Sequence, residues 1–142
     1  MIKINVIEKT KEIILAFPKM AEFCKEFSID YNENNIKNCG LFSVGDEIVK
    51  EDILGNQDRT HQFILFSVNA SYTDYDRLLN SGFLLELSYY LNKQKEIEID
   101  SGYIKSISTA NGMMYEIPTG NINDGIAYQL QIYTKYKIES EI

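Results

Sequence analysis

The residue best suited to acid–base chemistry is His61, the single histidine among the 142 residues of the chain. A serine or cysteine nucleophile usually needs a base beside it, so a Ser-His-Asp site would have to be built around His61. His61 comes just before the largely apolar run from Phe63 to Val68, and this position favours a structural or surface role. The motifs of zinc proteases, hydrolase elbows, P-loops and dinucleotide-binding folds are absent from the sequence. We therefore predict no catalytic residues and no cofactor.

Acidic residues could supply a second kind of chemistry, because paired carboxylates divide acid and base roles or hold divalent cations when they converge in a cleft. The pairs are Asp46 with Glu47, Glu51 with Asp52, Asp74 with Asp76, and Glu96 with Glu98 and Asp100. They flank expected strands and helix ends, where charge is solvated, and acidic residues also suit a helix N-terminus. We therefore expect no metal site.

Charge and hydropathy exclude several partners. The net charge is −7, the pI is near 4.7, and Arg59 and Arg77 are the only arginines. Tight nucleic-acid binding needs clustered basic residues, so it is not expected. No segment approaches the ~20 apolar residues of a membrane span, and charges are distributed through the N-terminal segment, where a signal peptide would be apolar. These features predict a cytoplasmic protein without a membrane partner.

Size and cysteine usage suit one ordinary globular domain. The chain is 44% apolar and 25% charged, and we expect a single domain over residues 1–142. Cys24 and Cys39 form no C-x-x-C motif. In a reducing compartment, two such cysteines are expected to be buried structural thiols.

Periodicity predicts helices at the start and in the middle of the chain. Apolar residues from Ile13 to Phe27 recur every three or four positions, and Pro18 interrupts them. This pattern predicts a short helix from about Val6, a second helix from Pro18 to Phe27, and an Asn-rich loop from Ser28 to Asn38. A longer helix is predicted from Asp74 to Lys93. Its interior Gly82 indicates either a kink or a close contact with the sheet, unless the glycine is simply tolerated.

The remaining segments predict strands. Two short strands are expected at Gly40–Val44 and Glu47–Leu54, followed by a turn at Gly55-Asn56-Gln57-Asp58 and a central strand at Thr60–Asn69 covered on both faces. Asn111-Gly112 predicts a hairpin between strands at Tyr103–Ala110 and Met113–Ile117. The last strand, Ile126–Ile138, alternates between an apolar and a polar face. The sum is an α+β fold with four to six mainly antiparallel strands and helices packed mainly on one side.

Tyrosine is the compositional oddity of the chain, with ten residues and no tryptophan. Tyrosine suits surfaces that are apolar in body and polar at the tip, such as contacts between subunits. A tyrosine-rich rim of the core is the alternative explanation. On the first interpretation, the candidate interface residues are Tyr72, Tyr75, Gln129, Gln131, Tyr133 and Lys135.

Three groups of residues carry a resemblance to a known protein family through their order and spacing. They are Gln62-Phe63-Ile64-Leu65-Phe66 with Tyr72, Asn80-Ser81-Gly82-Phe83 with Glu86, Leu87 and Leu91, and Ala127-Tyr128-Gln129-Leu130-Gln131 with Tyr136. With the helix-Pro-helix start and Ile48-Val49-Lys50 before Gly55, the pattern from Ile7 to Ile138 resembles the phage and prophage minor capsid or tail terminator proteins of phages of Gram-positive bacteria. It departs from that family at Val68-Asn69-Ala70-Ser71, where such proteins often carry an Arg-Glu pair.

The resemblance implies a ring of six subunits that caps the tail tube at its head-proximal end, stops tube polymerisation and connects to the neck or collar. The implied partners are further copies of the chain, the tail tube protein, and sheath and neck or collar proteins. The ring would belong to a virion or a headless tail-like bacteriocin assembled in the host cytoplasm. Two alternatives remain: another head–tail connector or neck protein, and a small host ligand-binding or enzymatic α/β domain.

Overall fold

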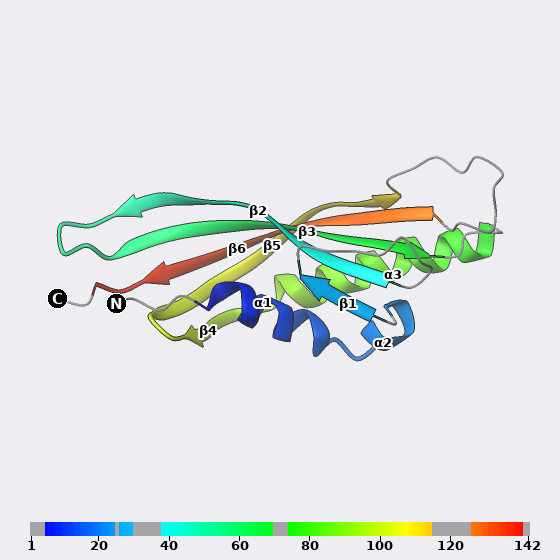
Figure 1. Cartoon of the computed structure of the whole chain (residues 1–142), viewed down its shortest axis with the longest axis horizontal. Coiled ribbons are helices and arrows are strands. Elements are labelled where there is room, and N and C mark those ends of the chain that lie inside the picture. The colour runs from blue at the N-terminus through cyan, green and yellow to red at the C-terminus, as the bar shows by residue number, and fades with distance from the viewer. Residues whose placement is uncertain (1–4, 25, 30–37, 70–73, 115–125, 141–142) are drawn as a thin grey trace.

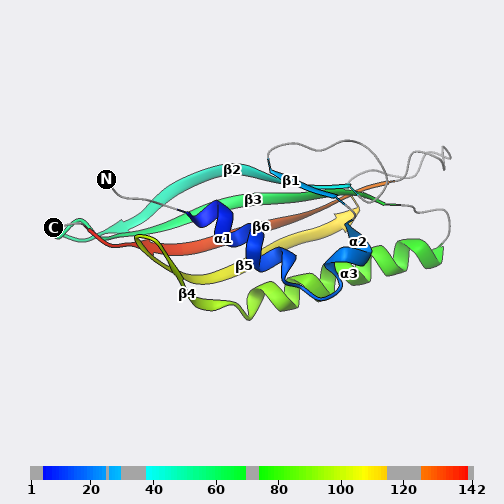
Figure 2. The ribbon, with the colours of Figure 1, turned by 60° about the horizontal axis from the view of Figure 1, so that its bottom comes forward.

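The computed structural model describes residues 5–24, 26–29, 38–69, 74–114 and 126–140. Its elements are α1 (Val6–Leu15), α2 (Met20–Phe23), β1 (Glu26–Ile29), β2 (Asn38–Glu51), β3 (Gln57–Asn69), α3 (Asp74–Asn92), β4 (Lys95–Ile99), β5 (Gly102–Met114) and β6 (Ile126–Ile138). The strands form one sheet in the order β1-β2-β3-β6-β5-β4, in which only β1 and β2 are parallel. The helices lie on one side of this sheet (Figure 1) (Figure 2). The α+β prediction is confirmed.

The helix break at Pro18 is confirmed, but the helix that follows is shorter than predicted. α1 ends at Leu15 and α2 begins at Met20, as expected around a residue that lacks a backbone donor. α2 has only four residues, because Cys24 adopts an extended conformation with φ −120° and ψ 117°. β1 pairs with β2, so Ser28, Ile29 and Asn38 of the predicted loop lie in strands. The rest of that loop, residues 30–37, lies outside the described residues.

One long strand replaces the two short strands predicted between Gly40 and Leu54. β2 spans 14 residues, and its pairing with β3 shifts register between Ser43 and Gly45 and again between Ile48 and Lys50. These irregularities absorb extra residues without ending the strand. The predicted chain reversal near Gly55 is confirmed: Gly55 has φ +88°, and its N–H donates to the carbonyl of Asp52 at 3.1 Å.

The hairpin predicted at Asn111-Gly112 is wrong. β5 continues through both residues to Met114 and pairs with β6 on either side of a register shift between Ala110 and Met113. The Asn-Gly signal is local, whereas the pairing partner is β6, which lies more than ten residues further along the chain. The end of the predicted return strand, Tyr115–Ile117, lies outside the described residues.

The core fills the space between the sheet and the helices. The alternation predicted for β6 is confirmed, because Tyr128, Leu130, Ile132, Thr134, Tyr136 and Ile138 are buried. α3 contributes Leu84, Leu87 and Leu91, and α1 contributes Val6, Thr10, Ile13 and Ile14. The central strand β3 departs from its prediction. Phe63 and Leu65 are buried against the helices, but Ile64 and Phe66 on the opposite face are only half-buried.

The expectation of free thiols is also wrong. Cys24 and Cys39 form a disulfide with their Cα atoms 5.6 Å apart. Cys24 directly follows α2, and Cys39 lies near the start of β2, where Phe27 of β1 pairs with Cys39. The sequence separation of 15 residues gives no sign of this proximity, which the parallel pairing of β1 and β2 creates.

Candidate functional site

The face of the sheet that points away from the helices is unusually poor in charge at its centre. The register of β3 and β6 places Gln62 opposite Tyr133, Ile64 opposite Gln131, and Phe66 opposite Gln129, all on this face. These side chains are half-buried within the chain alone. We call the six residues the open-face patch.

Hydrogen bonds link three polar side chains of the patch, those of Gln62, Gln131 and Tyr133. The Tyr133 hydroxyl donates to Oε1 of Gln131 at 2.9 Å, and Nε2 of Gln62 donates to the same hydroxyl at 3.4 Å. Phe66 meets Phe42 of β2 edge to face, with ring centroids 6.5 Å apart. The patch therefore presents ordered amide, phenol and apolar groups to its surroundings.

Charged residues begin at the rim of the patch. Lys135 pairs with Thr60 and is exposed, and Lys137 pairs with Asp58 further along the strands. A depression of about 260 Å³ adjoins the patch and is lined by Gly45, Asp46, Glu47, Thr60, Gln62 and Tyr133. An apolar and amide centre with a charged rim matches the anatomy of protein interfaces.

Four of the six predicted interface residues lie together here. Gln129, Gln131 and Tyr133 belong to the patch, and Lys135 belongs to its rim. Tyr72 lies outside the described residues, and Tyr75 lies in α3 in a part whose side chains the structure does not describe. Other tyrosines follow the alternative explanation, because Tyr128 and Tyr136 are buried in the core.

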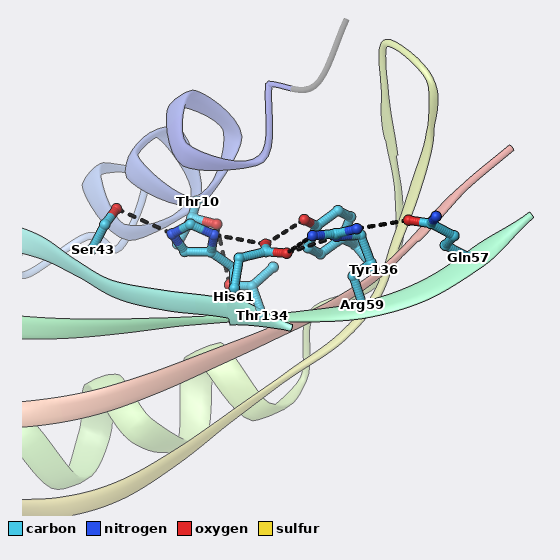
Figure 3. A network of polar contacts seen from close by, with 8 residues as sticks. Thr10, Ser43, Gln57, Arg59, His61, Thr134 and Tyr136 are labelled. Atoms are coloured by element: carbon cyan, nitrogen blue, oxygen red, sulfur yellow. Dashed lines mark hydrogen bonds and ion pairs between the residues drawn. The ribbon is translucent and has the colours of Figure 1, made fainter. Parts of the chain in front are cut away.

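A polar cluster lies on the other side of the sheet, where α1 covers it only in part (Figure 3). Nδ1 of His61 lies 2.8 Å from Oδ2 of Asp46, and Nε2 lies 3.1 Å from Oγ of Ser43. Nε and Nη2 of Arg59 contact Oδ1 of Asp46 at 2.7 and 2.6 Å. The Tyr136 hydroxyl donates to Oδ2 of Asp46. Asp46 is thus the centre of the cluster, which joins β2, β3 and β6.

These contacts perturb the ionisation of two groups. Partial burial raises the pKa of Asp46, but hydrogen bonds from Tyr136, His61 and Arg59 outweigh it and hold the pKa below its usual value. Burial, followed by the hydrogen bond to Asp46, raises the pKa of the Tyr136 hydroxyl well above its usual value. Asp46 therefore stays ionised and Tyr136 stays protonated at neutral pH.

The cluster contains a Ser-His-Asp sequence of contacts. Because Asp46 accepts the proton on Nδ1, a neutral His61 leaves Nε2 free to accept from the hydroxyl of Ser43. In a catalytic triad the carboxylate stabilises the imidazolium that forms during reaction. Here Arg59 already neutralises that carboxylate, and neither Ser43 nor His61 lines the adjoining depression. The geometry is that of a clamp which joins the strands.

Sequence reasoning missed the partners of His61. Ser43 and Asp46 lie on either side of the first register shift in β2, and the shift brings both side chains to the helix side of the sheet. Two separate short strands were predicted for this region, so no register with β3 could be assigned. The regular alternation of β6 gave a usable signal, and it placed Gln129, Gln131 and Tyr133 on the face opposite the core.

The outer part of the β2–β3 hairpin, residues 44–60, carries the clamp residues Asp46 and Arg59, and its β3 strand pairs with β6 as far as Gln57. We call residues 44–60 the hairpin arm (Figure 1). Five aliphatic side chains on it are each more than half exposed: Val44, Ile48, Val49, Ile53 and Leu54. The turn is rigid, because Oδ1 of Asp52 accepts hydrogen bonds from the backbone N–H groups of Leu54 and Asn56 at 2.9 and 3.0 Å. Sequence analysis did not single out this arm.

Comparison with models of protein families finds no match, and neither does comparison with curated proteins. None of the helices in the described ranges is long and apolar enough to cross a membrane. The same ranges contain no group of three or more His, Cys, Asp or Glu side chains placed to hold a metal ion.

Proposed function

We propose that the chain is a structural subunit that forms a ring at the head-proximal end of a phage-type tail tube. The sequence resemblance implies six copies in this ring. The ring stops tube polymerisation and connects the tail to the neck or collar. The observation that supports this proposal is the open-face patch: one face of the sheet carries ordered amide, phenol and apolar groups with charge only at the rim. A solvated sheet face is more usually covered with charged side chains.

Two further features agree with a role in assembly. Exposed aliphatic residues along the hairpin arm are typical of surfaces that a partner covers. The net charge of −7 lets the subunit surround a passage for DNA without binding phosphate tightly.

The proposal is tested by electron microscopy of particles assembled without the subunit. Tubes of uncontrolled length are expected, because nothing then stops addition of the tube protein. Uniform tails in the absence of the subunit would contradict the proposal and favour a connector role elsewhere in the neck.

A point variant links this outcome to the patch. Tyr133→Lys places a charge at the centre of the open face and is expected to fail in complementing the deletion. Ala21→Lys adds the same charge at an exposed position of α2 and is the matched control. Full complementation by Tyr133→Lys would show that the open face makes no essential contact.

The Ser43, His61 and Asp46 contacts favour one second candidate, a serine hydrolase. A fluorophosphonate probe distinguishes the two, because it forms a covalent adduct with an activated serine. We expect no adduct on Ser43, since Arg59 neutralises the carboxylate that would support His61. Stoichiometric labelling that disappears in Ser43→Ala would establish the hydrolase instead.

A further inference from the structure

The disulfide between Cys24 and Cys39 lies at one edge of the sheet. β1 is the outermost strand on that side, and it pairs in parallel with β2 through four residues only (Figure 1). Cys24 directly follows α2 and precedes β1, and Cys39 lies in the part of β2 that β1 covers. The disulfide therefore joins the start of an edge strand to the strand with which it pairs.

β1 has weak attachments of its own. It is four residues long, and parallel pairs are slightly less stable per residue than antiparallel ones. Phe27 and Ile29, the residues of β1 whose side chains the structure describes, are only partly buried against the core. The disulfide is thus a large part of what holds β1 on the sheet.

The elements on either side of β1 are attached independently of the disulfide. The ring of Phe23 in α2 stacks on Phe83 of α3 with centroids 4.0 Å apart, and Lys19 beside α2 forms an ion pair with Glu86 at 2.8 Å. β2 pairs with β3 along its whole length. If the disulfide opens, α2 and β2 keep these contacts, whereas β1 keeps only its short pairing.

The two sulfur atoms are placed for reversible chemistry. Cys24 is 7% exposed and Cys39 is 1% exposed, so an attacking thiolate reaches the sulfur of Cys24 first. The sequence contains only these two cysteines, so no third thiol of the chain diverts the exchange into another pairing. Because α2 and β2 stay attached, both thiols remain near one another for re-oxidation.

We propose that this disulfide is a redox latch: a dithiol opens the bond and releases β1 from β2, and oxidation of the two thiols fastens β1 again. One thiolate of the reductant attacks Sγ of Cys24, the S–S bond breaks, and Cys39 leaves as a thiolate that takes up a proton. The second thiol of the reductant then displaces Cys24, which takes up a proton in turn. Two electrons and two protons pass to the protein, and the reductant becomes a disulfide.

Release of β1 lengthens the free edge of the sheet. Among the described residues, no strand pairs with the outer edge of β2 beyond Leu41. Opening the latch extends this free edge back to Asn38, over all 14 residues of β2. Unpaired backbone groups on an edge strand are a template for pairing with another chain. The latch therefore controls how much of the edge is available, and it does so whether or not the chain forms the proposed ring.

Hydrogen exchange measured by mass spectrometry tests the latch on the full chain, before and after treatment with dithiothreitol. In the reduced chain, residues 26–29 are expected to lose their protection and to exchange like an unpaired segment. β6 lies between β3 and β5, away from the disulfide, and should remain protected. Thiol alkylation in a parallel sample shows that the bond is open. Re-oxidation with oxidised glutathione should restore protection at residues 26–29.

The double variant Cys24→Ser with Cys39→Ser separates the effect of the bond from that of the reagent. We expect it to exchange like the reduced chain and to show no response to dithiothreitol. Protection at residues 26–29 that survives complete reduction would overturn the latch, because β1 would then be held by pairing alone.

Two other results would also overturn it. Loss of protection by the same factor in β1 and β6 would identify a bond that stabilises the whole fold. A bond that dithiothreitol leaves closed until the chain unfolds would be a permanent link. The ring proposal is unaffected by these outcomes, since tail length tests it separately.

Discussion

Nδ1 of His61 lies 2.8 Å from Oδ2 of Asp46, although 15 residues separate them and neither lies in a turn. The contact crosses from β3 to β2 immediately beyond the first register shift of β2. Asp46 also binds Arg59 and Tyr136, so a single carboxylate joins the three strands at the base of the hairpin arm.

Replacing the central carboxylate should loosen this clamp. Asp46→Asn keeps the size of the side chain but removes the charge that Arg59 and His61 bind, and we expect a loss of about 2 kcal/mol in the free energy of unfolding. Urea denaturation measures the change. Glu47→Gln, at the adjacent exposed residue on the opposite face, is the control and should have little effect.

The same carboxylate predicts a dependence of stability on acid pH. The pKa of Asp46 in the folded chain lies below its ordinary value of 3.8, so folding favours the ionised form. Its contribution is present above the unfolded pKa and is lost as the pH falls through the folded pKa. Below pH 4 the stabilities of the unmodified chain and Asp46→Asn should converge. Curves that stay parallel from pH 7 to pH 2 would contradict the shift.

The Tyr136 hydroxyl should make stability depend on pH in the alkaline range. The pKa of this hydroxyl in the folded chain lies above the ordinary value of 10.0, so its contribution to stability is complete below pH 10 and is lost as the pH rises through the folded pKa. Tyr136 should stay protonated while the chain is folded. Its phenolate absorbance should therefore appear only when alkali unfolds the chain. Subtracting the titration of Tyr136→Phe isolates this signal, and a difference that titrates near pH 10 without unfolding would argue against it.

The buried hydroxyls of Thr10 and Thr134 form a further testable pair. They lie 3.2 Å apart, fully buried, and attach α1 to β6. Either single change to valine leaves one hydroxyl without its partner and should lower stability by about 1 to 2 kcal/mol. The double valine variant should be less destabilised than the sum of the two, because no hydroxyl is then left unpaired. Additive losses in the double-mutant cycle would mean that the hydroxyls do not interact.

The disulfide between Cys24 and Cys39 closes a loop of 15 residues by sequence separation. A loop of that length predicts about 3 kcal/mol of stabilisation through the unfolded state. The double serine variant should lose this amount, and the unmodified chain under reducing conditions should lose a similar amount. Mass spectrometry with and without thiol alkylation measures whether the bond is present in the assembled protein.

Elements with local, periodic signals could be predicted from the amino-acid sequence alone. The helix break follows from the missing donor of Pro18, and the two faces of β6 follow from alternation between residues such as Tyr128 and Gln129. Because side chains on a strand alternate strictly, the residues of the open-face patch on β6 were predictable in advance.

The pairing of the strands and its register could not be predicted and are visible only in the folded chain. The register shifts of β2 bring Ser43 and Asp46 to His61, and the continuous pairing of β5 with β6 removes the hairpin that Asn111-Gly112 predicts. The parallel pairing of β1 with β2 likewise brings Cys24 to Cys39. Such contacts join residues far apart along the chain, so local propensities do not predict them. A shift of one residue in the register would change every pair of side chains that meets across the strands.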